Sequence, residues 1–250
     1  PGAPLLAYYP DLGCRSMVDV DILVDEGSAL AVAAWLRAAG FSSPKRYPDL
    51  FIGDGLVLDI HTDLFHSERI AARGHVGQMH FEEMRARAVE YDVSGFALPA
   101  PCAEDALLYC SAHVLRHSYS RLGWLLDLRL LIERSVEEET VLHRANVASM
   151  QRPLLYALLF LRRYTALPTQ LARWSSERSV GAGEQWLMRR MWRERRDRAL
   201  GDFLWAFSFA GGAAQAALES KQIGLLKVPK KGATETNGSY IYNMIKFKQV

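Results

Sequence analysis

The segment Asp19-Val20-Asp21-Ile22-Leu23-Val24 is the most informative part of the sequence, because it sets two carboxylates two residues apart within a run of β-branched and aliphatic residues. Such a run predicts a β-strand, whose side chains point alternately to its two faces. Asp19 and Asp21 are therefore expected on one face of the strand, with the apolar side chains on the other. Two carboxylates on one face repel each other, and a divalent cation between them is the usual remedy.

A third acid follows on a second strand-like run, Leu56-Val57-Leu58-Asp59-Ile60-His61. Gly53-Asp54-Gly55 separates this run from Leu50–Ile52 and predicts a β-hairpin. The hairpin would bring Asp59 beside the first strand, and three acids on neighbouring strands are typical of sites that hold Mg²⁺ against nucleotide phosphates. The simpler interpretation is a pair of acids at an ordinary strand edge.

Further elements of the first half fit an α/β arrangement. A helix is expected over residues 2–9, and a second one over Ala29–Ala39, with Gly40 just past its end in the position that favours a left-handed residue. Residues 87–93 are expected to add another strand. Pro99-Ala100-Pro101 is the most plausible boundary with a helical second half.

The second half carries helical patterns throughout. Asp and Glu in the first turn at Glu104 and Asp105 suit a helix N-terminus, Pro153 fits a first helical turn, and Pro168 fits a helix stop. Helices are predicted over residues 103–117, 121–134, 137–149, 153–165, 183–200 and 202–219. The fold class is therefore α+β.

Several spaced elements carry a resemblance to a known family. They are Gly2, Leu5-Leu6-Ala7, Tyr9-Pro10-Asp11, Arg15, the Asp19–Val24 strand, Gly40-Phe41 and Leu58–His61, followed by Glu104–Leu108, His113, His117, Trp124 and Asp127. Together they resemble an uncharacterised nucleotidyltransferase family of the DNA polymerase β-like superfamily, over residues 2–135. The resemblance implies a polymerase β-like catalytic domain over residues 1–98 and an all-helical domain over 99–228. A flexible basic tail is expected over 229–250.

The resemblance implies a magnesium- or manganese-dependent nucleotidyltransferase, an enzyme of the EC 2.7.7 type. It would move a nucleoside monophosphate from an NTP, such as ATP, to a hydroxyl on a protein, an RNA or a small molecule, and release pyrophosphate. Asp19 and Asp21 would bind the metal, and Asp59 would complete the catalytic site. Gly2 would open the helix whose N-terminal amides help to hold the triphosphate.

Two departures from the family pattern stand out. The family's glycine motif usually reads Lys-Gly after a helical stretch, whereas this sequence starts at Pro1-Gly2, so we expect the catalytic domain to lack its N-terminal portion here. The family also carries Glu more often than Asp at position 59. These departures motivate an alternative, a catalytically inactive relative that binds a nucleotide, RNA or a partner protein.

Two further residues are candidates for nucleotide contacts. Arg15 lies four residues before Asp19, where a planar guanidinium suits phosphates, although an ion pair with Asp11 explains it equally well. His61 shares a strand face with Asp59, so it would touch a metal-bound phosphate or orient that carboxylate. A zinc site that also uses Asp63 and His66 is the weaker interpretation.

The helical half offers further polar candidates. His113 and His117 lie on one helix face, where packing is the default role and contact with a nucleobase is the alternative. Asp127 lies in a largely apolar helix and needs a partner, for which His113 or His117 is the candidate. An arginine series over residues 189–198 would either be a solvated helix face or grip a nucleic acid backbone.

Composition excludes some classes. A net charge of +2 on 250 residues gives no general affinity for polyanions. Three cysteines without disulfide or zinc spacing favour a reducing compartment, so we expect a cytoplasmic protein. No membrane segment is expected, since the apolar stretch Phe203–Leu218 is too short to span a bilayer. P-loop and Rossmann glycine motifs are absent from the sequence.

Overall fold

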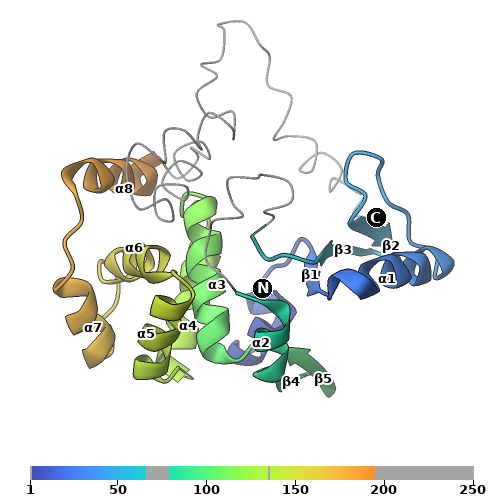
Figure 1. The fold of residues 1–250 in the computed structure, drawn as a ribbon, viewed down its shortest axis with the longest axis horizontal. Helices are drawn as coiled ribbons and strands as arrows, with labels where there is room; N and C mark the ends of the chain where they lie inside the picture. The colour runs from blue at the N-terminus through green and yellow to red at the C-terminus, as the bar shows by residue number, and fades with distance from the viewer. Residues whose placement is uncertain (1, 66–78, 135, 195–250) are drawn as a thin grey trace, which may run out of the picture.

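The α+β architecture predicted from the sequence is confirmed in a computed structural model that describes residues 2–65, 79–134 and 136–194 (Figure 1). The elements follow in this order: 3₁₀ helices η1 (Ala3–Tyr8) and η2 (Leu12–Cys14), β1 (Val20–Leu23), α1 (Glu26–Ala38), β2 (Leu50–Gly53), β3 (Leu56–His61), α2 (Phe81–Ala86), β4 (Val89–Val93), β5 (Phe96–Ala100), α3 (Ala103–Arg116), α4 (Leu122–Arg134), α5 (Glu138–Val147), α6 (Gln151–Leu161), α7 (Thr169–Ser176) and α8 (Ala182–Glu194).

The first sheet has the strand order β1-β3-β2, with β3 in the centre. β2 and β3 form the predicted antiparallel hairpin, and Asp54 and Gly55 both adopt left-handed conformations at its turn (φ 48° and 73°). β1 pairs with β3 in parallel. The parallel pair therefore sets the strand of Asp59 beside the strand of Asp21, as predicted.

Helix α1 packs against one face of this sheet. It begins at Asp25, whose carboxylate accepts a hydrogen bond from the Ser28 amide at 2.9 Å, and it ends before Gly40, which has φ 89° as predicted. Leu36, Phe51 and Ile60 form the small core between helix and sheet. Because side chains alternate along β3, the neighbours of Ile60 in the sequence lie on the opposite face of the sheet.

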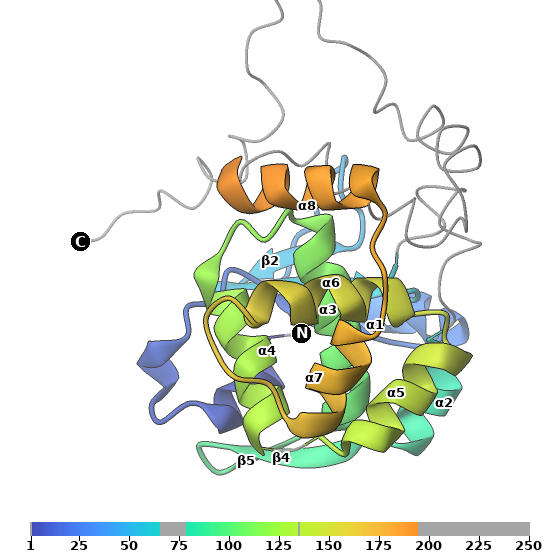
Figure 2. The same cartoon turned by 90° about the vertical axis from the view of Figure 1, so that its left-hand side faces the viewer.

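The helical half is built around α3, which α4, α5 and α6 surround (Figures 1 and 2). Its core also includes Leu5, Tyr8 and Tyr9 from η1 and Phe65 from the loop after β3. The helix expected over residues 2–9 is found as the 3₁₀ helix η1, and it packs against the helical half. Packing thus crosses the boundary expected after residue 98, and the division into domains stays a prediction.

Two elements escaped the sequence analysis. β5 was taken as part of a boundary because it contains Pro99, but it pairs with β4 in a separate two-stranded sheet, where a proline is tolerated on an edge strand. Pro168 was predicted to mark the end of a helix. It lies after the end of α6, but it is also the N-cap residue of helix α7, which the sequence analysis did not predict. Residues 195–250, with the helix expected over 202–219, lie outside the described part.

The other predicted helices are found with shifts of a few residues at their ends, and α8 is described up to Glu194. No helix within the described residues combines the length and the apolar character that crossing a bilayer requires.

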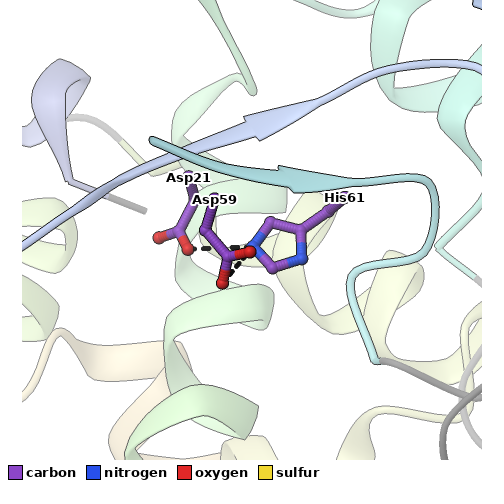
Figure 3. A group of neighbouring side chains, drawn as sticks. All are labelled: Asp21, Asp59 and His61. Atoms are coloured by element: carbon purple, nitrogen blue, oxygen red, sulfur yellow. Dashed lines mark hydrogen bonds and ion pairs between the residues drawn. The ribbon is translucent and has the colours of Figure 1, made fainter. Parts of the chain in front are cut away.

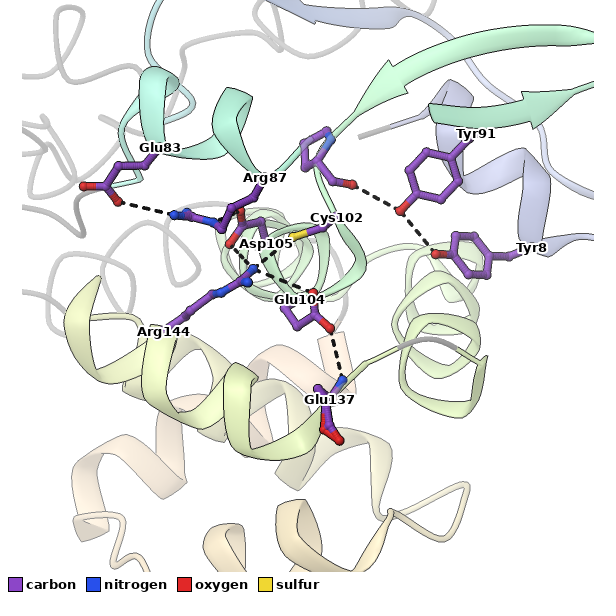
Figure 4. A network of polar contacts seen from close by, with 10 residues as sticks. Tyr8, Glu83, Arg87, Tyr91, Cys102, Glu104, Asp105, Glu137 and Arg144 are labelled. Atoms are coloured by element: carbon purple, nitrogen blue, oxygen red, sulfur yellow. Dashed lines mark hydrogen bonds and ion pairs between the residues drawn. The ribbon is translucent and has the colours of Figure 1, made fainter. Parts of the chain in front are cut away.

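A buried carboxylate joins two helices of the helical half to the chain that follows α2 (Figure 4). Asp105 on α3 is 1% exposed and accepts hydrogen bonds from Arg87 Nε at 3.0 Å and from Arg144 Nη1 at 3.1 Å. Arg144 also contacts Cys102 Sγ at 2.9 Å and Glu104 Oε2 at 3.7 Å. The network fixes the start of α3 against α5 and against the chain that follows α2.

We expect Asp105→Asn to lower the free energy of unfolding by about 3–5 kcal/mol, because it leaves two arginines without their shared counter-charge. Urea unfolding measures this change. Glu133→Gln is the matched control, since Glu133 pairs with Arg129 at 2.7 Å on an exposed helix face and should cost less than about 1 kcal/mol. Equal losses in the two variants would contradict this account of the network.

Candidate functional site

Two carboxylates face each other across the pair of parallel strands. Asp21 on β1 is in register with Asp59 on β3, and Leu23 is in register with His61. Neighbouring strands lie about 4.8 Å apart, so side chains on the same face at one register position must meet. The side chains of Asp21 and Asp59 remain 24% and 22% exposed, which leaves the pair open to solvent and to a ligand.

The imidazole of His61 lies beside both carboxylates (Figure 3). Its Nε2 atom is 3.0 Å from Asp21 Oδ1 and 3.5 Å from Asp59 Oδ2, and the side chain is 4% exposed. Burial opposes ionisation of Asp21, yet the pKa of Asp21 is lowered, and the hydrogen bond with His61 is among the contacts that stabilise its charge. Sequence analysis placed His61 on the face of Asp59 but did not foresee its contact with Asp21.

Asp21, Asp59 and His61 are suited to a divalent cation. Each offers one ligand atom, and these atoms all lie within 4.8 Å of one another. Two carboxylate oxygens match the preference of Mg²⁺ for hard ligands, while carboxylate together with imidazole also suits Mn²⁺. The residues present therefore fit the cation that the sequence predicted, although their donor set is not purely oxygen.

The third predicted metal ligand lies at the margin of this group. Asp19 precedes β1 and is exposed as a residue. Partial loss of water around its carboxyl group, followed by the negative charge of Asp21, raises the pKa of Asp19. Asp19 is therefore an electrostatic neighbour of Asp21, but it is not one of the three residues whose ligand atoms converge. Its role in binding metal stays a prediction.

Gly2 lies close to the segment that leads into β1. It is buried, and a Cβ atom at this position would lie 3.1 Å from Met17 Sδ and 3.6 Å from both the Asp19 carbonyl oxygen and Arg15 Nη1. A larger side chain would therefore have to displace the chain next to Asp19. The glycine motif and the acidic motif are adjacent in space, although 16 residues separate them in the sequence.

Arg15 is tied to the helical half. Its Nε and Nη2 atoms donate to Asp127 Oδ1 and Oδ2 on α4 at 2.8 and 2.9 Å, and Tyr9 Oη donates to Asp127 Oδ1 at 2.7 Å. The partner predicted for Asp127, His113 or His117, was therefore wrong: the N-terminal segment supplies it instead. The ion pair considered for Arg15 is real, but its acid is Asp127 and not Asp11, whose carboxylate caps the amide of Gly13.

His113 and His117 form an aromatic cluster with Trp124. The His113 and His117 rings lie 4.6 Å apart, and each lies about 5 Å from the Trp124 ring, over which the Arg121 guanidinium sits at 5.0 Å. Burial, and then the neighbouring His117, lower the pKa of His113 well below its ordinary value. The contacts fulfil the packing role expected for these histidines, and contact with a nucleobase stays a prediction.

Asp63, a candidate ligand in the weaker zinc interpretation, is not among the residues whose ligand atoms converge. Asp63 accepts a hydrogen bond from the Phe65 amide at 2.9 Å, so it stabilises the turn after β3. His66 lies outside the described residues. Arg46 lines a cavity of about 660 Å³ together with Leu30 and Ile60, which places its loop over the α1 face of the sheet and not over the acidic face.

The comparison with known families agrees with this geometry. The model of a family described as "uncharacterised nucleotidyltransferase" matches residues 2–166. The chain therefore belongs to this nucleotidyltransferase family, as its sequence motifs indicated, and a general role in nucleotidyl transfer follows. No curated protein and no solved structure was found to match the chain.

We expect Asp127→Ala to lower the free energy of unfolding by about 3–5 kcal/mol, because it leaves the guanidinium of Arg15 without its ion-pair partner, and the Arg15 side chain is only 10% exposed. Urea unfolding measures the loss. Replacing both partners, as Arg15→Met with Asp127→Leu, should restore part of it, since no buried charge then lacks a partner. Strictly additive costs of the two substitutions would show that the pair does not act as a unit.

Proposed function

We propose that this protein transfers a nucleoside monophosphate from an NTP to a hydroxyl group, with Asp21 and Asp59 holding the required Mg²⁺ or Mn²⁺. The observation that carries the proposal is the register of β1 and β3, which sets these two carboxylates opposite each other. Membership of a nucleotidyltransferase family supports the reaction class. The residues named do not select the base or the acceptor, which is a protein, an RNA or a small molecule.

The reaction joins the acceptor oxygen to the α-phosphorus and breaks the bond from that phosphorus to the bridging oxygen, so that pyrophosphate leaves and the hydroxyl proton is released. A divalent cation bound here would offset negative charge on the phosphates and would lower the pKa of the acceptor hydroxyl. Asp21 and Asp59 would orient that cation, with Asp19 as a further ligand at the margin of the site. His61 would hold both carboxylates in place through Nε2.

Gly2 and Arg15 would contact the triphosphate. The Arg15 guanidinium presents Nε and Nη2 to Asp127, and its Nη1 edge lies beside Gly2. A guanidinium held by one carboxylate is oriented before a ligand arrives, which reduces the entropic cost of a phosphate contact. The three cysteines are free thiols, which is consistent with a protein that works among the NTPs of a reducing cytoplasm.

One observation favours a second candidate function. His61 Nε2 lies within hydrogen-bond distance of Asp21 and close to Asp59, so an imidazole contacts the same oxygens that a metal would bind. A relative that has lost catalysis could keep its two carboxylates together in this way and still bind a nucleotide. Such a protein would bind NTP without releasing pyrophosphate.

We expect Asp21→Asn and Asp59→Asn each to reduce transfer at least about 100-fold, because each removes a charged metal ligand, and loss of an outer-shell partner alone costs about 10–100-fold. The measurement is transfer of label from each α-labelled NTP to acceptors in a cell lysate with Mg²⁺. Asp54→Asn is the matched control: Asp54 occupies the left-handed turn of the same hairpin, where Asn is also accepted, and transfer should be unchanged.

The outcomes separate the two candidates. Loss of labelling in both site variants, with the control active, supports the transferase. Calorimetric NTP binding without any labelling by the parent protein supports the inactive relative. Labelling that survives both Asp21→Asn and Asp59→Asn would refute the proposed metal site.

A further inference from the structure

A second cavity lies in the helical half, lined by residues of α6, α7 and α8 and of the loops that follow α6 and α7. These helices lie at the opposite end of the molecule from β3 (Figure 1). It has a volume of about 720 Å³, and its lining residues come from the C-terminal ends of α6 and α7 and from one side of α8. Four of its lining residues are arginines: Arg162, Arg163, Arg178 and Arg189. Ser175, Ser176 and Ser179 also line it, and none of its described lining residues is acidic.

The positive charge of this cavity is not balanced by acids within the described chain. None of the four arginines forms an ion pair with a described carboxylate of residues 2–65, 79–134 or 136–193. The acids close by are engaged elsewhere, since Glu177 pairs with Arg173 at 2.8 Å and Glu184 accepts a hydrogen bond from Tyr156 and lies 3.8 Å from Arg152. The charges therefore converge on the cavity itself.

Helix C-termini explain only part of this convergence. Arg178 Nη1 donates to the Trp174 carbonyl oxygen at 3.2 Å, as arginines often do at the end of a helix. Each C-terminus carries roughly half a negative elementary charge, so the ends of α6 and α7 offset about one of the four positive charges. Most of the positive charge is left for a ligand.

Aromatic rings hold two of the arginines in place. The guanidinium of Arg178 lies 3.9 Å from the centroid of Trp174, and that of Arg163 lies 5.2 Å from the centroid of Trp192. Stacking occupies the face of a guanidinium but leaves the N–H groups at its edge available to bind an anion. The buried indole Nε1 of Trp192, which also lines the cavity, has no hydrogen-bond partner within the described structure.

The size and surroundings of the cavity indicate a chain of phosphates and not a single one. A volume of about 720 Å³ exceeds what one phosphate fills. The basic surface also continues along α8, where the Arg190 guanidinium lies 5.6 Å from the ring centroid of Trp186, whose side chain is 57% exposed. Arginines interleaved with exposed aromatic rings match the phosphates and bases of single-stranded nucleic acid.

We propose that the arginine cavity between α6, α7 and α8 binds the phosphodiester backbone of single-stranded RNA. Arg162 and Arg189 provide charge-assisted hydrogen bonds to its phosphates, and the stacked Arg163 and Arg178 provide a pre-oriented pair. The binding does not require the acidic site, so it holds whether or not the protein transfers nucleotides. If the acceptor of the transfer reaction is an RNA, this is the surface that retains it.

The test is fluorescence anisotropy of a labelled single-stranded RNA of about 20 nucleotides, titrated with the full chain at several salt concentrations. We expect Arg162→Gln and Arg189→Gln each to reduce the slope of log K against log salt by about 0.7, the value for one lost phosphate contact on a single strand. Together they should weaken binding at least about tenfold, the effect of one lost charge-assisted hydrogen bond of about 1.4 kcal/mol.

Arg173→Gln is the matched control, because Arg173 lies on α7, is 79% exposed at its side chain and pairs with Glu177 outside the cavity. It should keep the parent slope. Thermal unfolding shows whether a variant is folded, and the Arg162 side chain forms no hydrogen bond or ion pair with the described residues. Asp21→Asn should lose transfer but bind RNA as the parent does, which separates failure of this proposal from failure of the proposed function.

Two outcomes would overturn the RNA proposal. One is an RNA affinity that Arg162→Gln and Arg189→Gln reduce no more than Arg173→Gln does. The other is binding of inorganic phosphate, lost in the cavity variants, by a protein that does not bind the RNA.

Discussion

The parallel pairing of β1 with β3 determines the geometry of the acidic site. It forces Asp21 and Asp59 to the same register position, where their charges repel unless a cation or a hydrogen-bond donor lies between them. His61, two residues beyond Asp59, brings an imidazole nitrogen to both oxygens. α1 covers the opposite face of the same sheet. One face of the sheet is therefore packed against a helix, and the other carries the acidic site.

Contacts outside the sheet also fix the position of β1, the strand that carries Asp21. The segment that enters β1 is tied to α4 through the bond from Arg15 to Asp127, and η1 contributes Leu5 and Tyr9 to the core of the helical half. A few buried charged groups therefore set the position of the strand that bears Asp21. Burying such groups is costly unless they are paired, so these contacts specify one arrangement of the sheet against the helices.

The sequence revealed the sheet more fully than the contacts around it. Alternation and the Gly53-Asp54-Gly55 turn were enough to predict the hairpin, because both signals are local. The pairing of β1 with β3, which sets Asp59 next to Asp21, is a long-range contact that these local signals do not determine. The partner of Asp127 could not be predicted. An acid in an apolar helix indicates that a hydrogen-bond donor must lie nearby, but the sequence does not show which distant residue supplies it. β5 was missed because a proline inside a strand signals a break unless one knows that the strand lies at an edge. The arginine cavity could not be predicted for a similar reason. Its arginines lie just after α6, just after α7 and on α8, and only Arg189 belongs to the arginine series over residues 189–198.

The central claim is that one divalent cation bridges Asp21 and Asp59. Crystals of the protein grown with Mn²⁺ and a non-hydrolysable NTP analogue would test it through the anomalous scattering of manganese. The account predicts a peak about 2.0–2.2 Å from a carboxylate oxygen of each residue, with the α-phosphate of the analogue beside it. A nucleotide bound elsewhere, or manganese that contacts neither carboxylate, would contradict it.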